Sequence, residues 1–314
     1  MVISGGDRPV SMPHPGYYDA TGSEIVSLNV SANTWKILRP FCVPGEPQPN
    51  RPDSVTWVYD SKRDRGLMAP GYYFMMGSGC GAIEGWGGYA FDFATKKYIG
   101  PNEVAGLPQP PAGGGGPGWG GDNGASFGVY DPVGDELIRL RTGPRMERLN
   151  LQTKVWRTQE LSIGALWNPN PNRAQSVIDA HGRAVYWLDI WGQFSATGPG
   201  TPYLAKTSLI DGSTTRIALP PQWVPVEGLG NDIYLAFDPS NRLVLIPNSF
   251  GMGGTPLSGL GIYRVDTAVW EWDSVPSAVL GSVWGFDEHL GALVGIGKRV
   301  QPYAYYFWKY GPRP

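Results

Sequence analysis

Three histidines and a regularly spaced set of aspartates are the residues whose types could do chemistry in this sequence. Imidazole and carboxylate groups act as general acids, general bases and metal ligands. The histidines are His14, His181 and His289, and the aspartates are Asp60, Asp131, Asp179, Asp238 and Asp287. Each aspartate ends a short apolar run and is followed by a tight polar connection, which is typical of a turn-forming residue. We therefore predict that the aspartates, His181 and His289 lie in turns. We predict no catalytic residue, metal site or cofactor, and hence no enzyme.

A glycine-rich run at 113–118 has only a superficial likeness to a phosphate-binding loop, because no Gly-Lys-Ser/Thr follows it. The net charge is −2 and the pI is about 5.9, with no basic stripe, which argues against a nucleic-acid partner. No apolar run approaches the roughly 20 residues that span a bilayer, so we expect no membrane insertion. The remaining class of function is binding.

Aromatic and methionine side chains placed among glycines are the candidate binding residues. They are Tyr72, Tyr73, Phe74, Trp86, Trp119, Trp191, Phe194, Phe250 and Met252. Aromatic residues and methionine are enriched at the centres of protein interfaces. The alternative for each ring is that it packs inward and holds its own loop in place.

A short phrase recurs along the chain at intervals of about 60 residues, which indicates an array of equivalent structural units. The copies are Asn29–Trp35, Asp92–Tyr98, Asn150–Trp156 and Arg264–Trp270, with a looser copy at 209–217. Upstream of most copies, two short apolar runs flank the aspartate turn. Runs of this length, rich in β-branched and aromatic residues, predict strands. No segment has the pattern of an amphipathic helix.

Each unit is predicted to have four antiparallel strands, a to d, and we predict an all-β fold that is a β-propeller with 1–314 as one domain. Radial repetition of such sheets protects their edges. The rings of Trp35, Tyr98, Trp156 and Trp270 open strand d and are expected to pack between neighbouring sheets.

The strand pattern favours six blades. It contains a and d strands five times, and b and c strands six times. The predicted blades are 54–100, 122–161, 172–219 and 229–275, with irregular terminal blades at 1–38 and 279–314. The alternative is five blades with a C-terminal extension.

The chain resembles the kelch-type propeller family, which includes the central domain of galactose-oxidase-like proteins. The resemblance covers nearly the whole chain. It is carried by the aromatic-Asp turn before strand b, the Asn/Asp-x-x-Thr-x-x-Trp phrase and the Gly5-Gly6 pair. Copper chemistry in the galactose-oxidase group needs paired His and Tyr ligands, which we do not identify here. Residues 1–35, with Gly16-Tyr-Tyr18 and Glu24–Asn29, are also similar to propeller proteins of tailed bacteriophages.

The two sets of connections differ in predicted length. The a–b and c–d turns emerge at one edge of an antiparallel blade and are short. The b–c and d–a connections emerge at the other edge and include long segments such as 71–88 and 101–124. Long loops on a rigid scaffold often carry binding residues. We therefore expect the candidate aromatics to form the working surface and the short turns to be comparatively bare.

Two functions follow from this pattern. The first is a non-enzymatic docking propeller, most simply a virion component such as a phage tail or nozzle part, by fold-level analogy. Its partners would be other protein subunits, and a homo-oligomer is an open alternative. The second is a carbohydrate-binding, lectin-like propeller in which Trp86, Trp119 and Trp191 stack on a glycan. The start of the sequence lacks the pattern of a signal peptide, so we expect synthesis in the cytoplasm and, for the first function, location in a virion.

Overall fold

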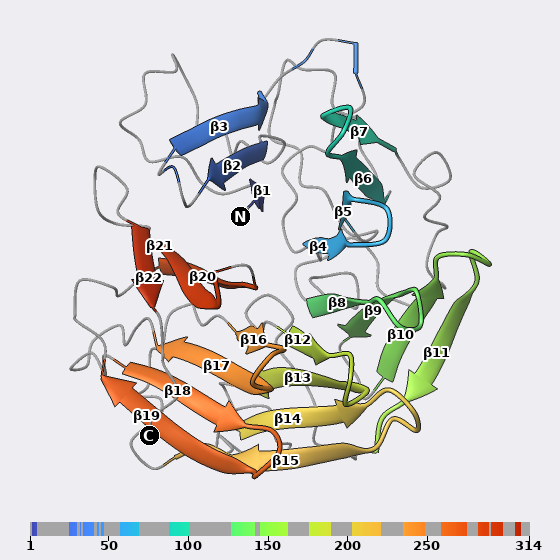
Figure 1. Cartoon of the computed structure of the whole chain (residues 1–314). Helices are drawn as coiled ribbons and strands as arrows, with labels where there is room; N and C mark the ends of the chain where they lie inside the picture. The colour runs from blue at the N-terminus through green and yellow to red at the C-terminus, as the bar shows by residue number, and fades with distance from the viewer. Residues whose placement is uncertain are drawn as a thin grey trace, which may run out of the picture. The chain divides into compact units, whose positions relative to one another are not determined.

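The computed structural model shows a protein made of strands (Figure 1). It describes residues 2–4, 25–29, 32, 34–40, 43, 45–46, 57–68, 88–100, 127–141, 145–162, 176–189, 203–220, 235–248, 259–274, 282–288, 290–297 and 305–308. The chain divides into two compact units. Unit 1 comprises 1–141 and 146–158, and unit 2 comprises 142–145 and 159–314. Each unit is described by itself, and the prediction that 1–314 is a single domain stays a prediction.

Unit 1 contains three antiparallel sheets, except that the first residue of β10 and the last two residues of β11 are assigned to unit 2. Sheet 1 is β1 (Val2–Ser4), β2 (Ile25–Asn29) and β3 (Thr34–Arg39). Sheet 2 is β4 (Trp57–Asp60), β5 (Arg65–Met68), β6 (Tyr89–Asp92) and β7 (Lys97–Ile99). Sheet 3 is β8 (Phe127–Asp131), β9 (Glu136–Arg141), β10 (Arg145–Asn150) and β11 (Trp156–Glu160).

Unit 2 contains the other three sheets. Sheet 4 is β12 (Ser176–Asp179), β13 (Ala184–Asp189), β14 (Tyr203–Ser208) and β15 (Thr214–Ala218). Sheet 5 is β16 (Ala236–Asp238), β17 (Leu243–Asn248), β18 (Gly259–Arg264) and β19 (Val269–Ser274). Sheet 6 is β20 (Ser282–Asp287), β21 (Ala292–Gly297) and β22 (Tyr305–Trp308).

Every sheet is a meander in which consecutive strands are hydrogen-bonded neighbours, as in a propeller blade. The strands fall where the sequence predicts them, with each predicted aspartate ending an a strand. The predicted all-β propeller of four-stranded antiparallel blades is therefore confirmed. Four sheets have all four strands, and sheets 1 and 6 have three described strands each. The predicted count of six blades, with irregular terminal blades, is not confirmed.

The a–b turns share one backbone design. Each spans four residues, and its last residue has a positive φ, at Asp64, Asp135, Arg183, Arg242 and Gly291. Only one of these is glycine, so the left-handed conformation is imposed on four larger residues. It is stabilised by the aspartate that ends strand a, whose carboxylate accepts hydrogen bonds from backbone N–H groups of the turn. Asp238, for example, accepts from Ser240 at 2.9 Å and from Asn241 at 3.2 Å.

The c–d turns follow the same rule. Asp92 accepts from the Thr95 N–H at 2.7 Å, and Asn150 accepts from Gln152 and Thr153 at 3.0 and 2.8 Å. The turn-forming role predicted for the aspartates that end the a strands is confirmed by their hydrogen bonds to the a–b turns. His181 also lies in a turn, between β12 and β13, as predicted. His14 and His289 lie outside the described residues.

The hydrophobic core lies between the faces of neighbouring sheets. Between sheets 2 and 3, Val58 and Leu67 pack with Tyr130 and Leu149. Sheets 4 and 5 are joined in the same way by a cluster that includes Tyr186, Leu204, Val244, Ile246 and Tyr263. Further clusters join sheets 1 and 2 and sheets 5 and 6. Burial of these faces removes apolar area from water and is the main stabilising term for each pair of sheets.

The repeated aromatics of strand d contribute to these clusters, as predicted. Tyr98 is buried, and Trp156 and Trp270 are half-buried against the cores of their units. Trp270 also donates its indole N–H to the Ala218 carbonyl at 2.9 Å, which links sheet 5 to sheet 4. The side chain of Trp35 lies outside the described residues.

One connection is shorter than the sequence predicts. We expected every b–c and d–a connection to be long, but β9 ends at Arg141 and β10 begins at Arg145. Sheet 3 therefore turns tightly at both of its edges. Strands b and c of this sheet have six residues each, as in sheets 4 and 5, so the short connection reflects the few residues between the strands and not longer strands.

Candidate functional site

The aromatic residues predicted to bind a partner all lie outside the described residues. These are Tyr72, Tyr73, Phe74, Trp86, Trp119, Trp191, Phe194, Phe250 and Met252. The glycine-rich run at 113–118 also lies outside them. The predicted binding site therefore stays a prediction.

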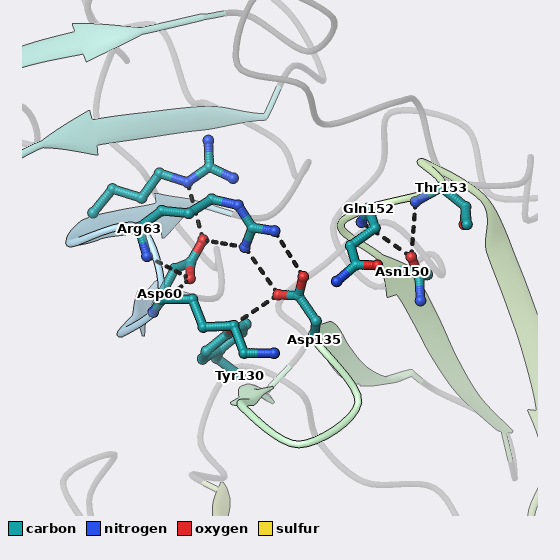
Figure 2. A network of polar contacts seen from close by, with 9 residues as sticks. Asp60, Arg63, Tyr130, Asp135, Asn150, Gln152 and Thr153 are labelled. Atoms are coloured by element: carbon teal, nitrogen blue, oxygen red, sulfur yellow. Dashed lines mark hydrogen bonds and ion pairs between the residues drawn. The ribbon is translucent and has the colours of Figure 1, made fainter.

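A polar network at the tight turns of unit 1 is the most connected group in the described part (Figure 2). It begins at Asp60, which is fully buried at the end of β4. One carboxylate oxygen of Asp60 accepts from the N–H groups of Lys62 and Arg63, at 3.2 and 3.3 Å. The other accepts from Arg63 Nη1 at 3.0 Å and from Arg65 Nε at 3.1 Å. Asp60 therefore shapes its own turn and also fixes two arginines.

Arg63 carries the network from sheet 2 to sheet 3. Its Nη1 donates to Oδ1 of Asp135 at 2.9 Å and its Nη2 donates to Oδ2 at 2.7 Å (Figure 2). This two-pronged geometry matches the planar guanidinium to the planar carboxylate and is stronger than a single contact. Tyr130, on β8, completes the site by donating its hydroxyl to Asp135 Oδ1 at 2.8 Å.

The electrostatics of the network favour ionised Asp135 and protonated Tyr130 near neutral pH. The Arg63 guanidinium holds the pKa of Asp135 well below its usual range, with the Tyr130 hydroxyl acting in the same direction. Burial raises the pKa of Tyr130, and its hydrogen bond to Asp135 raises it further. Asp135 is thus ionised and Tyr130 protonated. The arrangement is that of an ion-pair link between two sheets.

Unit 2 has a comparable link between sheets 4 and 5. Arg242, in the β16–β17 turn, donates Nη2 to Asp179 Oδ2 at 2.7 Å and Nη1 to Asp266. The other oxygen of Asp179 accepts the Gly182 N–H at 2.8 Å and shapes the β12–β13 turn. The hydrogen bond to Asp179 raises the pKa of Arg242. The order of the two partners along the chain is reversed relative to unit 1. In unit 1 the arginine belongs to the earlier sheet of the pair, and in unit 2 it belongs to the later sheet.

A second set of ion pairs lies within sheet 3. Arg139 Nε donates to Glu147 Oε2 at 2.6 Å, and its guanidinium lies over the Trp156 ring at 5.0 Å. Glu136 accepts from Arg148 Nε at 2.8 Å and from Arg157 Nη2 at 2.8 Å. All of these side chains except Arg157 and Trp156 are buried. Buried charges need such pairing, because an unpaired ion in the interior is strongly destabilising.

Sequence reasoning missed these networks. It identified Asp60 and Asp179 as turn formers, but not that their second oxygen binds an arginine. A signal was present, since Arg63, Asp135, Arg183 and Arg242 are charged residues in the last two positions of turns where small or polar residues are usual. Which arginine meets which aspartate depends on how neighbouring sheets pack, and the spacing within one turn does not specify that.

Two further searches concern only the residues that the structure describes. Among them, no three histidine, cysteine, aspartate or glutamate side chains are grouped so that they could hold a metal ion. No helix in that part of the chain has the length and hydropathy of a membrane-spanning segment.

Comparison with known proteins gives one kind of match. No protein-family model and no curated protein sequence matches the chain. Among solved structures, it is similar to a chain of a crystal structure of a nidogen/laminin complex, with 12% sequence identity and a TM-score of 0.46. The match covers 88% of this chain and 86% of that one. At this level of similarity it carries no inference about a partner or an activity. The resemblances to kelch-type and phage propellers are not confirmed and stay hypotheses.

Proposed function

We propose that this chain is a non-enzymatic docking propeller of six blades that binds other protein subunits through its b–c and d–a connections. The observation that carries the proposal is the difference between the two edges of its blades. The a–b and c–d turns are short, and their aspartates and asparagines are bonded to the turn backbone. We call this edge the tight-turn edge, and the opposite edge the loop edge.

The loop edge has the capacity for a partner site. Residues 69–88 lie between β5 and β6, and residues 100–126 lie between β7 and β8. These two segments contain Tyr72, Tyr73, Phe74, Trp86 and Trp119. A rigid strand scaffold that presents long aromatic-rich connections is a common arrangement for protein recognition.

The context that we propose is a virion, with the chain as a tail or nozzle component. The support is the similarity of residues 1–35 to propeller proteins of tailed phages and the fold-level analogy with propellers in short phage tails. Six blades are supported by the six separate meander sheets, of which four have all four strands in the predicted order and two have three described strands each.

The proposal is tested by asking whether the chain travels with virus particles. An antibody against the chain should detect it in the particle fraction of a density gradient of a producing culture. If the chain stays wholly in the soluble fractions at the top of the gradient, the virion role is wrong. Binding of the purified chain to a glycan array, abolished by Trp86→Ala or Trp119→Ala, would instead support the lectin-like function.

The loop edge is tested within the same assay. Phe74→Ala combined with Trp119→Ala should remove the chain from the particle fraction without lowering its melting temperature. Ser61→Ala, on the tight-turn edge, is the control and should leave both unchanged. A double variant that no longer folds would show that these rings hold their own loops in place.

A further inference from the structure

Exposed aliphatic side chains gather at the tight-turn edge, where polar residues are usual. Six large hydrophobic side chains are exposed in the described part of the chain, and four of them lie in or beside the tight turns. In unit 1 these are Val133 and Val155, which are 64% and 60% exposed. In unit 2 they are Ile210 and Val269, which are 79% and 49% exposed. One exposed aliphatic residue is ordinary, whereas two in the tight turns of each unit are candidates for a contact surface.

The tight turns of unit 1 carry exposed positive charge. Lys62 lies in the β4–β5 turn, Lys96 in the β6–β7 turn and Lys154 in the β10–β11 turn, and all three are exposed. Asp64 is an exposed acid in the same turns, and it already accepts the Tyr59 hydroxyl at 2.9 Å. Partial burial lowers the pKa of Lys154, and the positive charges of Arg65 and Arg63 lower it further. A negatively charged partner would be attracted to this edge.

The turns of unit 2 have the opposite sign. Asp211 lies beside Ile210 in the β14–β15 turn, Asp266 lies in the β18–β19 turn, and Glu288 follows β20, and all three are exposed. Hydrogen bonds from the backbone and hydroxyl of Ser213, with a further contribution from Ser208, lower the pKa of Asp211 to about 2, so it is ionised at neutral pH. Among the described residues of these turns, the basic ones are His181, which is exposed, Arg183, which is half-buried, and Arg242, which is paired with Asp179 and Asp266.

Both edges are held in fixed conformations before any contact is made. Positive φ residues end the a–b turns, aspartate and asparagine oxygens bond the turn amides, and Arg63 joins the turns of sheets 2 and 3. A surface ordered in this way loses little conformational entropy when it binds, which favours association through a small contact area.

We propose that the lysine-rich tight-turn edge of unit 1 binds the acidic tight-turn edge of unit 2 of a second copy of the chain. Lys62, Lys96 and Lys154 would face Asp211, Asp266 and Glu288, and the exposed aliphatic residues would be covered between them. The second copy is the occupant that the chain itself supplies, with complementary charge and matching apolar side chains. This contact uses the edge opposite the loops, so it leaves the proposed partner site open.

The test is the oligomeric state of the full chain as a function of salt. Sedimentation velocity should show self-association in about 0.05 M salt that weakens at least about tenfold in about 0.5 M salt, because ions screen exposed charges. Lys62→Glu with Lys154→Glu should make the chain monomeric at low salt. Mixing that variant with a chain carrying Asp211→Lys and Glu288→Lys should restore a complex of the two, since the unit 1 edge of the first chain is then net negative and the unit 2 edge of the second is net positive.

Two further variants make the result specific. Lys36→Glu changes the charge of an exposed lysine on β3, outside the turns, and should leave association unchanged. Val133→Asp, at an exposed position, should weaken association by itself while the circular dichroism spectrum stays that of the unmodified chain. The proposal is overturned if the chain is monomeric at every salt concentration and up to about 100 µM, a range in which even transient contacts are detectable. It is equally overturned if Lys36→Glu weakens self-association as much as the turn variants do.

Discussion

Arg63 and Asp135 lie 72 residues apart in the sequence and form a two-pronged ion pair, with N–O distances of 2.9 and 2.7 Å. The pair joins the first turn of sheet 2 to the first turn of sheet 3. Asp60 also accepts a hydrogen bond from Arg63, and Tyr130 also donates one to Asp135. The turns of sheets 2 and 3 therefore form one polar network. The tight-turn edges of sheets 2 and 3 are thereby fixed by contacts that neither sheet could provide alone.

This pair predicts a pH-dependent contribution to stability. The pKa of Asp135 is lower in the folded chain than its unfolded value of about 3.9. Its charge therefore stabilises the fold above about pH 4, and that contribution is lost as the pH falls toward the folded-state pKa. Asp135→Asn should lower the free energy of unfolding by about 2 kcal/mol at pH 7, with a smaller difference at pH 3. Urea titrations at the two pH values measure this.

The matched control for Asp135 is Asp64→Asn, at an exposed acid of the adjacent turn that also has a positive φ. It should change stability by less than about 0.5 kcal/mol, as most surface substitutions do. Equal unfolding free energies for Asp135→Asn and the unmodified chain at pH 7 would show that the ion pair contributes nothing.

The left-handed residues of the turns give a second prediction. Ala268, in the β18–β19 turn, has a φ of 55°, a conformation that strains a residue with a Cβ. Ala268→Gly should therefore stabilise the chain by roughly 0.5–1 kcal/mol, because glycine adopts this conformation freely. Ala94→Gly, in the β6–β7 turn, is the comparison, because Ala94 is not among the described residues with a positive φ. It should be neutral or destabilising, and thermal melts that rank the two variants in the reverse order would contradict the turn geometry.

The indole of Trp270 gives a third prediction, at the junction of sheets 4 and 5. Its ring packs beside Tyr263 with 5.1 Å between centroids, and its N–H bonds the Ala218 carbonyl. Trp270→Phe should keep the ring contact, lose the hydrogen bond and lower the unfolding free energy by about 1 kcal/mol. Trp270→Ala should cost about 3 kcal/mol, the low end for an aromatic truncation, because the ring is only half-buried. If both substitutions are neutral by urea denaturation, the ring does not join the sheets.

The strand pattern of this fold could be predicted from the sequence because it is a local property. Apolar runs ending at Asp131 or Asp179, followed by a polar turn, specify two strands and their connection without reference to the rest of the chain. The a strands that end at the five predicted aspartates therefore lie where expected. The exception is the β9–β10 connection, which is shorter than predicted. Charged residues such as Arg141 and Arg145 belong to the strands there, and the sequence pattern does not distinguish them from residues of a loop.

The ion-pair links could not be predicted in the same way. Arg63, the third residue of its turn, pairs with Asp135 of the following sheet, whereas Arg242, the fourth residue of its turn, pairs with Asp179 of the preceding sheet. The buried pairs of sheet 3 pose a similar problem. From their charge, Glu136 and Arg148 would be predicted to be exposed, and only the packing of the sheet shows that they are buried. Long-range packing decides these contacts, and the short repeat phrase does not encode it.

The claim that the loop edge binds the partner is tested most directly by hydrogen exchange on the chain in its assembled particle and on the free chain. We predict that slower exchange on assembly is centred on peptides from 69–88 and 100–126, which contain Phe74 and Trp119. Exchange in the β16–β17 turn should be little changed by the particle. Protection confined to the tight turns or to the outer strands β11, β15 and β19, with the two loop segments unchanged, would contradict the account.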